Sequence, residues 1–246
     1  MKYNEAERLV AVNRFHQFNF DLNKNLHSLL RLATDIYETP VAFLTLVDKD
    51  DQMFKVCYGF EVQLMPRNTS FCTHVVALEE PMVVADANAD NRFTDNPMVM
   101  HPPHIRFYAG APLTTNDGFT IGTLCVMDVK SKETTENKKH QLHILAQQTM
   151  NLMELELTHK MLNEKMQQVA EQNKVLREIA FIQSHEFRGP LTSIMGLMNI
   201  IRQEADTVSH TYYLQLMDEA VKKLDEKIHV VVKSTEVAES TWRALA

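Results

Sequence analysis

The residues best suited to chemistry lie in one short stretch of the C-terminal half, from Ser184 to Leu191. At its centre, His185 is followed directly by the carboxylate of Glu186. A neutral imidazole can attack with one ring nitrogen while a neighbouring carboxylate takes or orients the proton on the other nitrogen. The pair therefore suits a histidine that attacks phosphorus. Taken without its surroundings, a His-Glu pair is more often a solvated helix face.

Nearby residues set how His185 is presented. Ser184 and Phe187 fall on the apolar stripe of the surrounding helical pattern, so His185 is predicted to face solvent. Pro190 lacks a backbone N–H and its ring clashes with the preceding turn, which predicts a kink or hinge close to the histidine. A helix that bends to present one side chain would be built in this way.

The stretch lies within a long helical repeat. One series recurs every seven positions and a second follows each member by four: Leu155, Leu162, Val169 and Leu176, then His159, Met166, Asn173 and Ala180. This heptad predicts a two-stranded coiled coil, in which a buried Asn173 would fix the register and the dimeric state. A single long amphipathic helix is the alternative. The second series continues through Phe187, Ile194 and Ile201.

A second helix is expected after a short break. Residues 204–209 interrupt the pattern and offer Thr207 or Ser209 as the N-cap of the next helix. Apolar residues then recur at spacings of three and four: Leu214, Met217, Val221, Leu224, Ile228 and Val231. The two helices form a predicted hairpin. Because one hairpin cannot bury two full stripes, we expect two hairpins to pair into a dimeric four-helix bundle.

The stretch around His185 resembles the H-box of sensor histidine kinases, where an S-H-E-x-R-x-P-L string lies in the first helix of the dimerisation and phosphoacceptor (HisKA) hairpin. The likeness covers roughly residues 176–240. It implies that His185 is the phosphorylated histidine and that Glu186 is the acid that helps to activate it. It also implies that Arg188 and Pro190 shape the kinase contact and the bend.

Two residues depart from the pattern of that family. Phe187 stands where a smaller aliphatic residue is common, which is a mild difference. Gly189 stands four residues after the histidine, where these kinases usually carry Thr or Asn. In the family that side chain positions the water that dephosphorylates the response regulator. Because glycine has no side chain to position a water, we expect weak phosphatase activity.

The N-terminal half has a different sequence pattern, in which short strand-like runs are separated by residues typical of turns. The runs fall at residues 41–48, 52–58, 81–86, 105–110 and 119–126. Most of them lie close enough in sequence to pair as hairpins or meanders, which favours an antiparallel sheet. Leu22 to Tyr37 has helical spacing, with leucines on one face.

Several strings in this half resemble the GAF domains of bacterial sensor kinases. They are residues 41–48, 70–74, 84–87, 90–93, 106–113 and 122–128. The likeness spans about residues 22–150. It implies an α+β fold with a central antiparallel sheet flanked by helices, and it leaves the ligand unknown, because GAF domains bind cyclic nucleotides, bilins, haem or nothing known.

The N-terminal half matches the sequence signatures for bilin, cyclic nucleotides and metal ions poorly. Thr73 separates Cys72 from His74, whereas bilin attachment in the family involves a Cys directly followed by His. Residues 90–93 match only part of a cyclic-nucleotide signature. The pairs at positions 101 and 104, and at 140 and 143, have spacings that a metal could use, but neither has an obvious third ligand. We therefore expect no metal site.

Composition narrows the class of protein. The 246 residues carry 25 Lys and Arg against 32 Asp and Glu, a net charge of −7, with no basic cluster to grip nucleic acid. The odd number of cysteines, Cys57, Cys72 and Cys125, without CxxC spacing predicts buried free thiols in a reducing compartment. There is no membrane-spanning apolar run and no signal-peptide core, which predicts a cytoplasmic protein.

A working histidine kinase also needs an ATP-binding domain, and the sequence offers no place for one. No glycine follows Gly196, so no phosphate-cradling loop can be built after it. ATP and Mg are therefore expected on a catalytic domain outside this chain, and no cofactor within it. We expect either a fragment of a longer kinase or a natural truncation that is phosphorylated in trans.

These expectations give a domain plan: an N-terminal helix at 1–21, a GAF sensor at 22–150, a coiled-coil signalling helix at 151–178, a HisKA phosphotransfer domain at 179–240 and a C-terminal end at 241–246. The expected protein is a homodimeric member of the protein-histidine kinase family. It would receive phosphate from an ATP-binding domain in cis or in trans and pass it to the receiver domain of a response regulator. The alternatives are a stand-alone phosphotransfer protein and a non-enzymatic GAF ligand-binding dimerisation module.

Overall fold

The computed structural model describes residues 4–244 apart from 19, 21–23, 63 and 204–206, and for residues 182–185, 203, 207–210 and 231–244 it describes the backbone alone. The chain divides into two compact units, Met1–Leu162 and Asn163–Ala246. The helix α5 (Glu136–Gln203) begins in the first unit and ends in the second.

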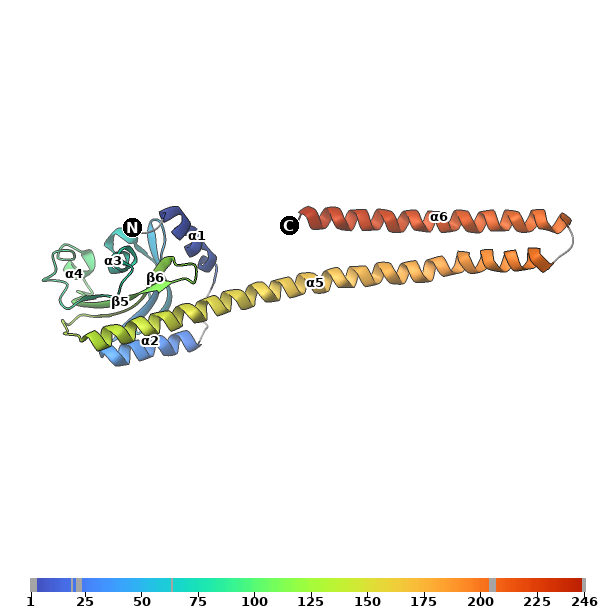
Figure 1. Cartoon of the computed structure of the whole chain (residues 1–246). Coiled ribbons are helices and arrows are strands. Elements are labelled where there is room, and N and C mark those ends of the chain that lie inside the picture. The colour runs from blue at the N-terminus through green and yellow to red at the C-terminus, as the bar shows by residue number, and fades with distance from the viewer. Residues whose placement is uncertain (1–3, 19, 21–23, 63, 204–206, 245–246) are drawn as a thin grey trace. The chain divides into compact units, whose positions relative to one another are not determined.

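The N-terminal unit is built on a six-stranded sheet (Figure 1). In chain order its strands are β1 (Val41–Val47), β2 (Asp51–Tyr58), β3 (Leu64–Pro66), β4 (Met82–Val84), β5 (Phe107–Thr114) and β6 (Thr120–Asp128). In space they follow the order β3-β2-β1-β6-β5-β4, and every neighbouring pair is antiparallel. The predicted antiparallel sheet is confirmed. The short edge strand β3 has no counterpart in the sequence pattern.

Helices cover both faces of this sheet. On one face lie α1 (Glu5–His16), α2 (Lys24–Tyr37) and the first turns of α5, whose apolar side chains share one core with the sheet. On the other face lie the short helix η1 (Arg67–Thr69), α3 (Phe71–Leu78) and α4 (Pro97–Met100). A second core, built around the stacked aromatic rings of Phe71, Phe93 and Tyr108, fills that side.

This double covering explains the composition of the central strands. Every residue of β6 is buried, as are six of the seven residues of β1. A strand with two covered faces needs apolar or paired side chains at every position, so it reads as a continuous apolar run rather than an alternating one. The buried threonines of these strands meet this need by pairing, since the Thr45 and Thr123 hydroxyls lie 3.0 Å apart.

The C-terminal unit is a hairpin of two long helices, the end of α5 and α6 (Thr207–Ala244). Helix α5 continues through Pro190 without interruption. Both expected N-caps of α6 were placed wrongly, because Thr207 and Ser209 lie inside the helix. The apolar periodicity begins only at Leu214, so it marks the packed part of the helix and not its first turns.

The cysteine prediction is confirmed for two residues. Cys72 and Cys125 are fully buried, whereas Cys57 on β2 is only partly buried, and none of the three forms a disulfide. Strand β2 is the second strand from the sheet edge, where fewer side chains pack over it, and this explains why Cys57 is only partly buried. Among the helices that the structure describes, none is both long enough and apolar enough to cross a membrane.

A buried cation joins helix α1 to the sheet. Arg8 is 4% exposed and donates from Nη1 to the Val47 carbonyl at 2.7 Å. Its Nε and Nη2 bind the Glu5 carboxylate at 2.8 and 2.9 Å, and Arg67 adds a third bond to that carboxylate at 2.7 Å. The hydrogen bond from Arg8 lowers the pKa of Glu5 to about 2, with burial opposing it and Arg67 assisting.

Replacing Glu5 by Gln should therefore destabilise the N-terminal unit in a pH-dependent way. The carboxyl ionises more easily when folded, so its contribution is present above its ordinary pKa of 4.5 and is lost as the pH falls towards about 2. Because Glu5 is partly exposed, we expect a loss of no more than about 1 kcal/mol at pH 7. Urea unfolding at pH 7 and near pH 2 measures it. Glu7→Gln, at an exposed site two positions further along α1, is the control, and an equal loss in both variants at pH 7 would contradict the assignment.

Candidate functional site

The histidine singled out by the sequence lies within the hairpin unit, on α5. Its side chain and that of Ser184 are outside the described residues, so the predicted solvent-facing orientation of His185 stays a prediction. The residues that follow are described. Glu186, Arg188 and Gly189 are exposed, and Phe187 is half-buried, as its place in the apolar series predicts.

The acid beside the histidine is tied to the second helix. The Lys227 ammonium on α6 donates to Glu186 Oε2 at 2.9 Å, and both side chains are between a third and a half exposed. An ion pair this exposed adds little stability. It does fix where the carboxylate lies. The sequence reasoning missed Lys227, although the residue lies about as far after the break at 204–206 as Glu186 lies before it, which is the symmetry that an antiparallel hairpin requires.

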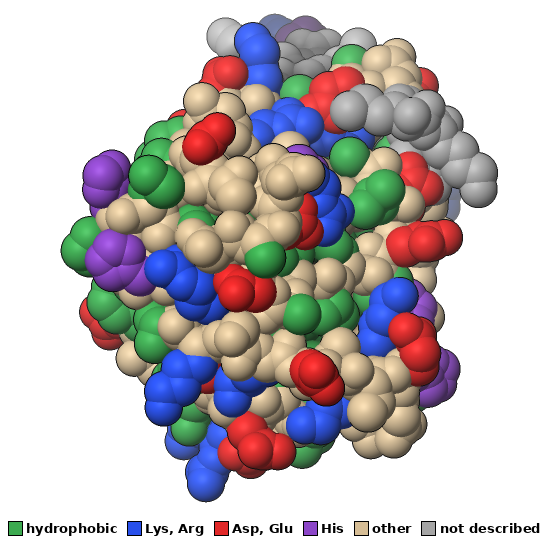
Figure 2. Space-filling model, turned by 90° about the vertical axis from the view of Figure 1, so that its left-hand side faces the viewer, with side chains coloured by type: hydrophobic (Ala, Val, Ile, Leu, Met, Phe, Trp, Pro, Cys, Tyr) green, Lys and Arg blue, Asp and Glu red, His purple; other side chains and the backbone are tan. Residues whose placement is uncertain are grey.

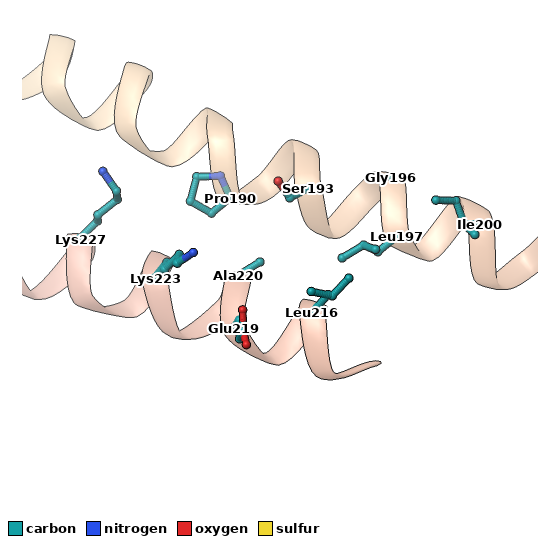
Figure 3. Close-up of a pocket in the computed structure, with 10 residues that line it drawn as sticks. All are labelled: Pro190, Ser193, Gly196, Leu197, Ile200, Leu216, Glu219, Ala220, Lys223 and Lys227. Atoms are coloured by element: carbon teal, nitrogen blue, oxygen red, sulfur yellow. The ribbon is translucent and has the colours of Figure 1, made fainter. Parts of the chain in front are cut away.

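A groove of about 620 Å³ runs between the two helices from Pro190 onward (Figure 3). Its lining residues are Pro190, Ser193, Gly196, Leu197 and Ile200 on α5, and Leu216, Glu219, Ala220, Lys223 and Lys227 on α6. The floor is apolar, and the two lysines stand along the α6 side. Ala220 is 8% exposed, so the helices approach closely at this point.

The residues around Pro190 bond to nearby carbonyls of the helix. Thr192 Oγ1 donates to the Arg188 carbonyl at 2.7 Å, and Ser193 Oγ donates to the Gly189 carbonyl at 3.1 Å. Hydrogen bonds of this kind to the preceding turn satisfy carbonyls and favour slight bending. A Cβ atom added at Gly189 would meet nothing within 4 Å. The position therefore has room for the side chain that the sequence lacks.

Much of the apolar stripe on both helices is uncovered within the chain. The exposed large apolar side chains of the second unit that the structure describes include Met166, Val169, Leu176, Phe181, Leu191, Met195, Met198, Ile200, Tyr212, Leu214, Val221, Ile228 and Val230. They include residues of the predicted heptad and of the predicted α6 stripe. One hairpin thus leaves a large part of its apolar surface open to solvent, which is unusual for a chain that stays monomeric.

A second candidate site is an apolar pocket of about 220 Å³ in the N-terminal unit. Its lining residues are Pro40, Val41, Phe43, Phe54, Gly59, Phe60, Val62, Met65, Met98, Pro103, Ile105, Met127, Asp128 and Val129. The ionisable member, Asp128, is nearly buried and pairs with Lys132 at 3.2 Å. A pocket with one neutralised carboxylate and otherwise apolar walls suits a small, mostly apolar molecule.

The histidines with candidate metal or chromophore roles are spread apart. His74 packs edge-on against Phe93, with ring centroids 4.9 Å apart, whereas Cys72 points into the buried core. His101 and His104 are exposed. Within the described part of the chain, no three His, Cys, Asp or Glu side chains gather to hold a metal ion. On the face shown in Figure 2, Lys and Arg side chains lie among Asp and Glu rather than in one patch.

Comparison with known proteins identifies the N-terminal unit. The sequence matches the family model of the GAF domain over residues 21–157, more than half of the chain. It is 37% identical over 124 residues to a cyclic di-GMP phosphodiesterase of Pseudomonas aeruginosa, a match covering 50% of this chain and 21% of that protein. The chain therefore spans about a fifth of the length of this curated relative.

Two solved structures of GAF domains match this chain at low sequence identity. The GAF domain of a phosphoenolpyruvate-protein phosphotransferase from Acinetobacter is 16% identical, with a TM-score of 0.46, over 66% of this chain and 99% of its own. The GAF region of a putative membrane protein from Geobacter sulfurreducens is 17% identical, with a TM-score of 0.47, over 59% of this chain and 99% of its own. The family assignment depends on the family model and not on these structures. The chain belongs to the GAF domain family.

Proposed function

We propose that this chain is a signalling module in which the GAF domain is the sensor and His185 on the helical hairpin accepts a phosphoryl group. The observation that carries the proposal is the α5–α6 hairpin, whose first helix bears the Ser184–Leu191 stretch and whose second helix holds Glu186 through Lys227. A hairpin with this motif on its first helix is what the resemblance to the HisKA family implies.

The chemistry would proceed in two transfers. A ring nitrogen of His185 attacks the γ-phosphorus of ATP, the bond to the bridging oxygen breaks, and ADP leaves. The ATP and Mg²⁺ belong to a catalytic domain supplied from outside this chain. The phosphoryl group then passes to an aspartate of a response-regulator receiver domain, which restores the imidazole. Glu186, the next residue along the chain, whose carboxylate accepts the 2.9 Å bond from Lys227, would orient or accept the proton of the other ring nitrogen.

The exposed apolar surface of the hairpin supports a proposal of dimerisation. Leu191, Met195 and Leu214 are 46%, 65% and 58% exposed in the single chain, so covering the exposed half of each is worth roughly 1 kcal/mol per side chain. Pairing two hairpins into a four-helix bundle would cover these residues. The exposed heptad positions Leu155, Leu162 and Val169 would pair in a coiled coil. We therefore propose a homodimer.

The proposed function is tested by phosphorylation in trans. The chain is incubated with the isolated catalytic domain of a histidine kinase, Mg²⁺ and γ-labelled ATP, and the product is treated with acid and with alkali. We expect label that is lost in acid and kept in alkali, mapped to the α5 peptide that contains His185. Transfer of that label to a receiver domain completes the test. A chain that takes no label from several kinase domains, or takes acid-stable label, contradicts the proposal.

A second candidate function is supported by the relative from Pseudomonas aeruginosa. That protein is a cyclic di-GMP phosphodiesterase, so a sequence similar to this chain occurs in an enzyme with a different output. Under this alternative the GAF domain binds a small molecule and the helices serve only for dimerisation. Stable dimers without histidine label would favour it.

Gly189→Thr should raise the phosphatase activity of the module on its regulator. The resemblance to the kinase family gives this position the side chain that positions the attacking water, and a Cβ there meets nothing within 4 Å, so the hairpin tolerates the change. We expect a several-fold shorter half-life of the phosphorylated receiver domain with the variant than with the parent. Gly196→Ala, at an equally open site two turns further on, is the control. A parent chain that already shortens the half-life strongly would contradict the predicted role of Gly189.

A further inference from the structure

Two buried thiols face one another between α3 and the centre of the sheet. Cys72 Sγ in the first turn of α3 lies 3.8 Å from Cys125 Sγ on β6, and neither residue is measurably exposed. The hydroxyl of Tyr108 on β5 donates to Cys72 Sγ at 3.5 Å. The proposed function uses none of these three side chains.

The local fold holds this arrangement in place. Ser70 caps α3 by accepting from the Thr73 amide at 3.2 Å, which fixes the first turn of the helix over β6. Gly110 lies opposite Cys125 in the pairing of β5 with β6. Tyr108 occupies the space beside Gly110 that a Cβ would fill, and its hydroxyl thereby reaches Cys72.

The two thiols differ in how easily they ionise. Burial opposes ionisation of Cys72, but hydrogen bonds from Cys125, Thr123, Tyr108 and Thr45 outweigh it and lower the pKa of its thiol. The hydrogen bond to Cys72, together with burial, raises the pKa of Cys125. Cys72 also receives the Tyr108 hydroxyl and lies in the first turn of α3, where the helix N-terminus favours a thiolate, so we assign it as the thiol that attacks the oxidant.

The third cysteine lies too far from Cys125 to pair with it. Cys57 on β2 and Cys125 on β6 both lie opposite Phe43 of β1, so two strand spacings separate them. Neighbouring strands lie about 4.8 Å apart, which places these Cα atoms about 10 Å apart. Disulfides need Cα atoms within about 7 Å. Cys57 therefore serves as an internal control, because it is a thiol of the same domain that cannot form a disulfide with Cys125.

We propose that Cys72 and Cys125 form a reversible redox site in which a peroxide converts the two thiols into a disulfide that joins α3 to β6. The Cys72 thiolate attacks one oxygen of hydrogen peroxide, the O–O bond breaks, and the leaving hydroxide takes up the proton that the thiol released, which gives a sulfenic acid and water. The Cys125 thiol then attacks the Cys72 sulfur, the S–O bond breaks and a second water leaves. Both sulfurs are oxidised, both peroxide oxygens are reduced, and a dithiol reductant restores the thiols.

The geometry sets the rate of this reaction. The sulfurs must approach from 3.8 Å to about 2 Å, a movement that side-chain rotation and a small shift of α3 supply. Because both thiols are buried, the peroxide reaches Cys72 only during local opening of the short helix α3. We therefore expect slow oxidation in the folded protein and equally slow reduction of the product.

Mass spectrometry of the whole chain tests the proposal. The reduced protein is exposed to hydrogen peroxide, denatured, alkylated and digested. We expect a peptide pair linked through Cys72 and Cys125, two hydrogen atoms lighter than the separate peptides, with Cys57 still alkylated. Dithiothreitol should restore three alkylated cysteines. Alkylation of all three cysteines after peroxide, or a cross-link that includes Cys57, would overturn the proposal.

Matched variants separate the site from general oxidation. Cys57→Ser should form the cross-link at the rate of the parent, whereas Cys72→Ser and Cys125→Ser should form none. Tyr108→Phe keeps the ring in place and removes the donor to Cys72, so it should slow the cross-link. Cross-linking that is unchanged in Tyr108→Phe would overturn the part assigned to the hydroxyl. If a serine variant does not fold, the peptide map of the parent still decides the proposal.

Discussion

A His185→Gln variant should lose all of the acid-labile label that a histidine-kinase catalytic domain and ATP place on the parent chain. Glutamine keeps a polar side chain of similar length, but its amide nitrogen has no free electron pair to attack phosphorus. The expected loss is complete, because no other group of the hairpin would replace the imidazole. Label is counted on gels run at alkaline pH, with quantification relative to the parent.

The control for this result is another histidine of the same hairpin. His229 on α6 is exposed, and His229→Gln should be labelled as well as the parent. Both variants should keep the helical content and the oligomeric state of the parent, measured by circular dichroism and light scattering. Label that persists in His185→Gln at the parental level would end the phosphoacceptor interpretation, whereas loss in both variants would point to a damaged docking surface.

The sheet could be predicted from the sequence because its central strands are covered on both faces. A run such as Val41–Val47 must be apolar or paired at every position when helices lie above and below it, and this leaves a clear signal. Strand β3 is short, lies at the edge and is mostly exposed, so packing places few demands on its residues. The start of α6 was placed too late, because Thr207 and Ser209 both lie in the helix.

The candidate sites were predictable to different degrees. The motif around His185 is local in sequence, so its resemblance to the H-box of sensor histidine kinases could be seen without a structure. The pairing of Glu186 with Lys227 depends on where the hairpin turns, and the pairing of Cys72 with Cys125 depends on which residue of α3 lies over β6. That second contact also needs the space at Gly110 on another strand, which no sequence spacing encodes. Contacts of this kind join elements whose relative position is decided only by the packed core.

Gly122→Ala should destabilise the GAF domain severely, although it adds only one methyl group. Gly122 lies on β6 opposite Leu46 of β1, and an added Cβ would run into the backbone carbonyl of Thr45. Backbone cannot rotate aside as a side chain can, so the two central strands would have to separate or lose their register. Both faces of these strands carry the cores, and we expect a loss of about 3 kcal/mol or more.

A second glycine of the same domain shows whether this close approach is the cause. Gly118, in the turn between β5 and β6, has a φ of +92° but open space around it, so Gly118→Ala should cost about 1 kcal/mol for the left-handed backbone alone. Urea unfolding followed by near-ultraviolet circular dichroism of the buried Tyr108 and phenylalanine rings compares the two variants. If Gly122→Ala loses no more stability than Gly118→Ala, then β1 and β6 do not approach as closely as the fold requires. The Thr45–Thr123 hydroxyl pair beside the thiols, on the same two strands, would then have no fixed geometry.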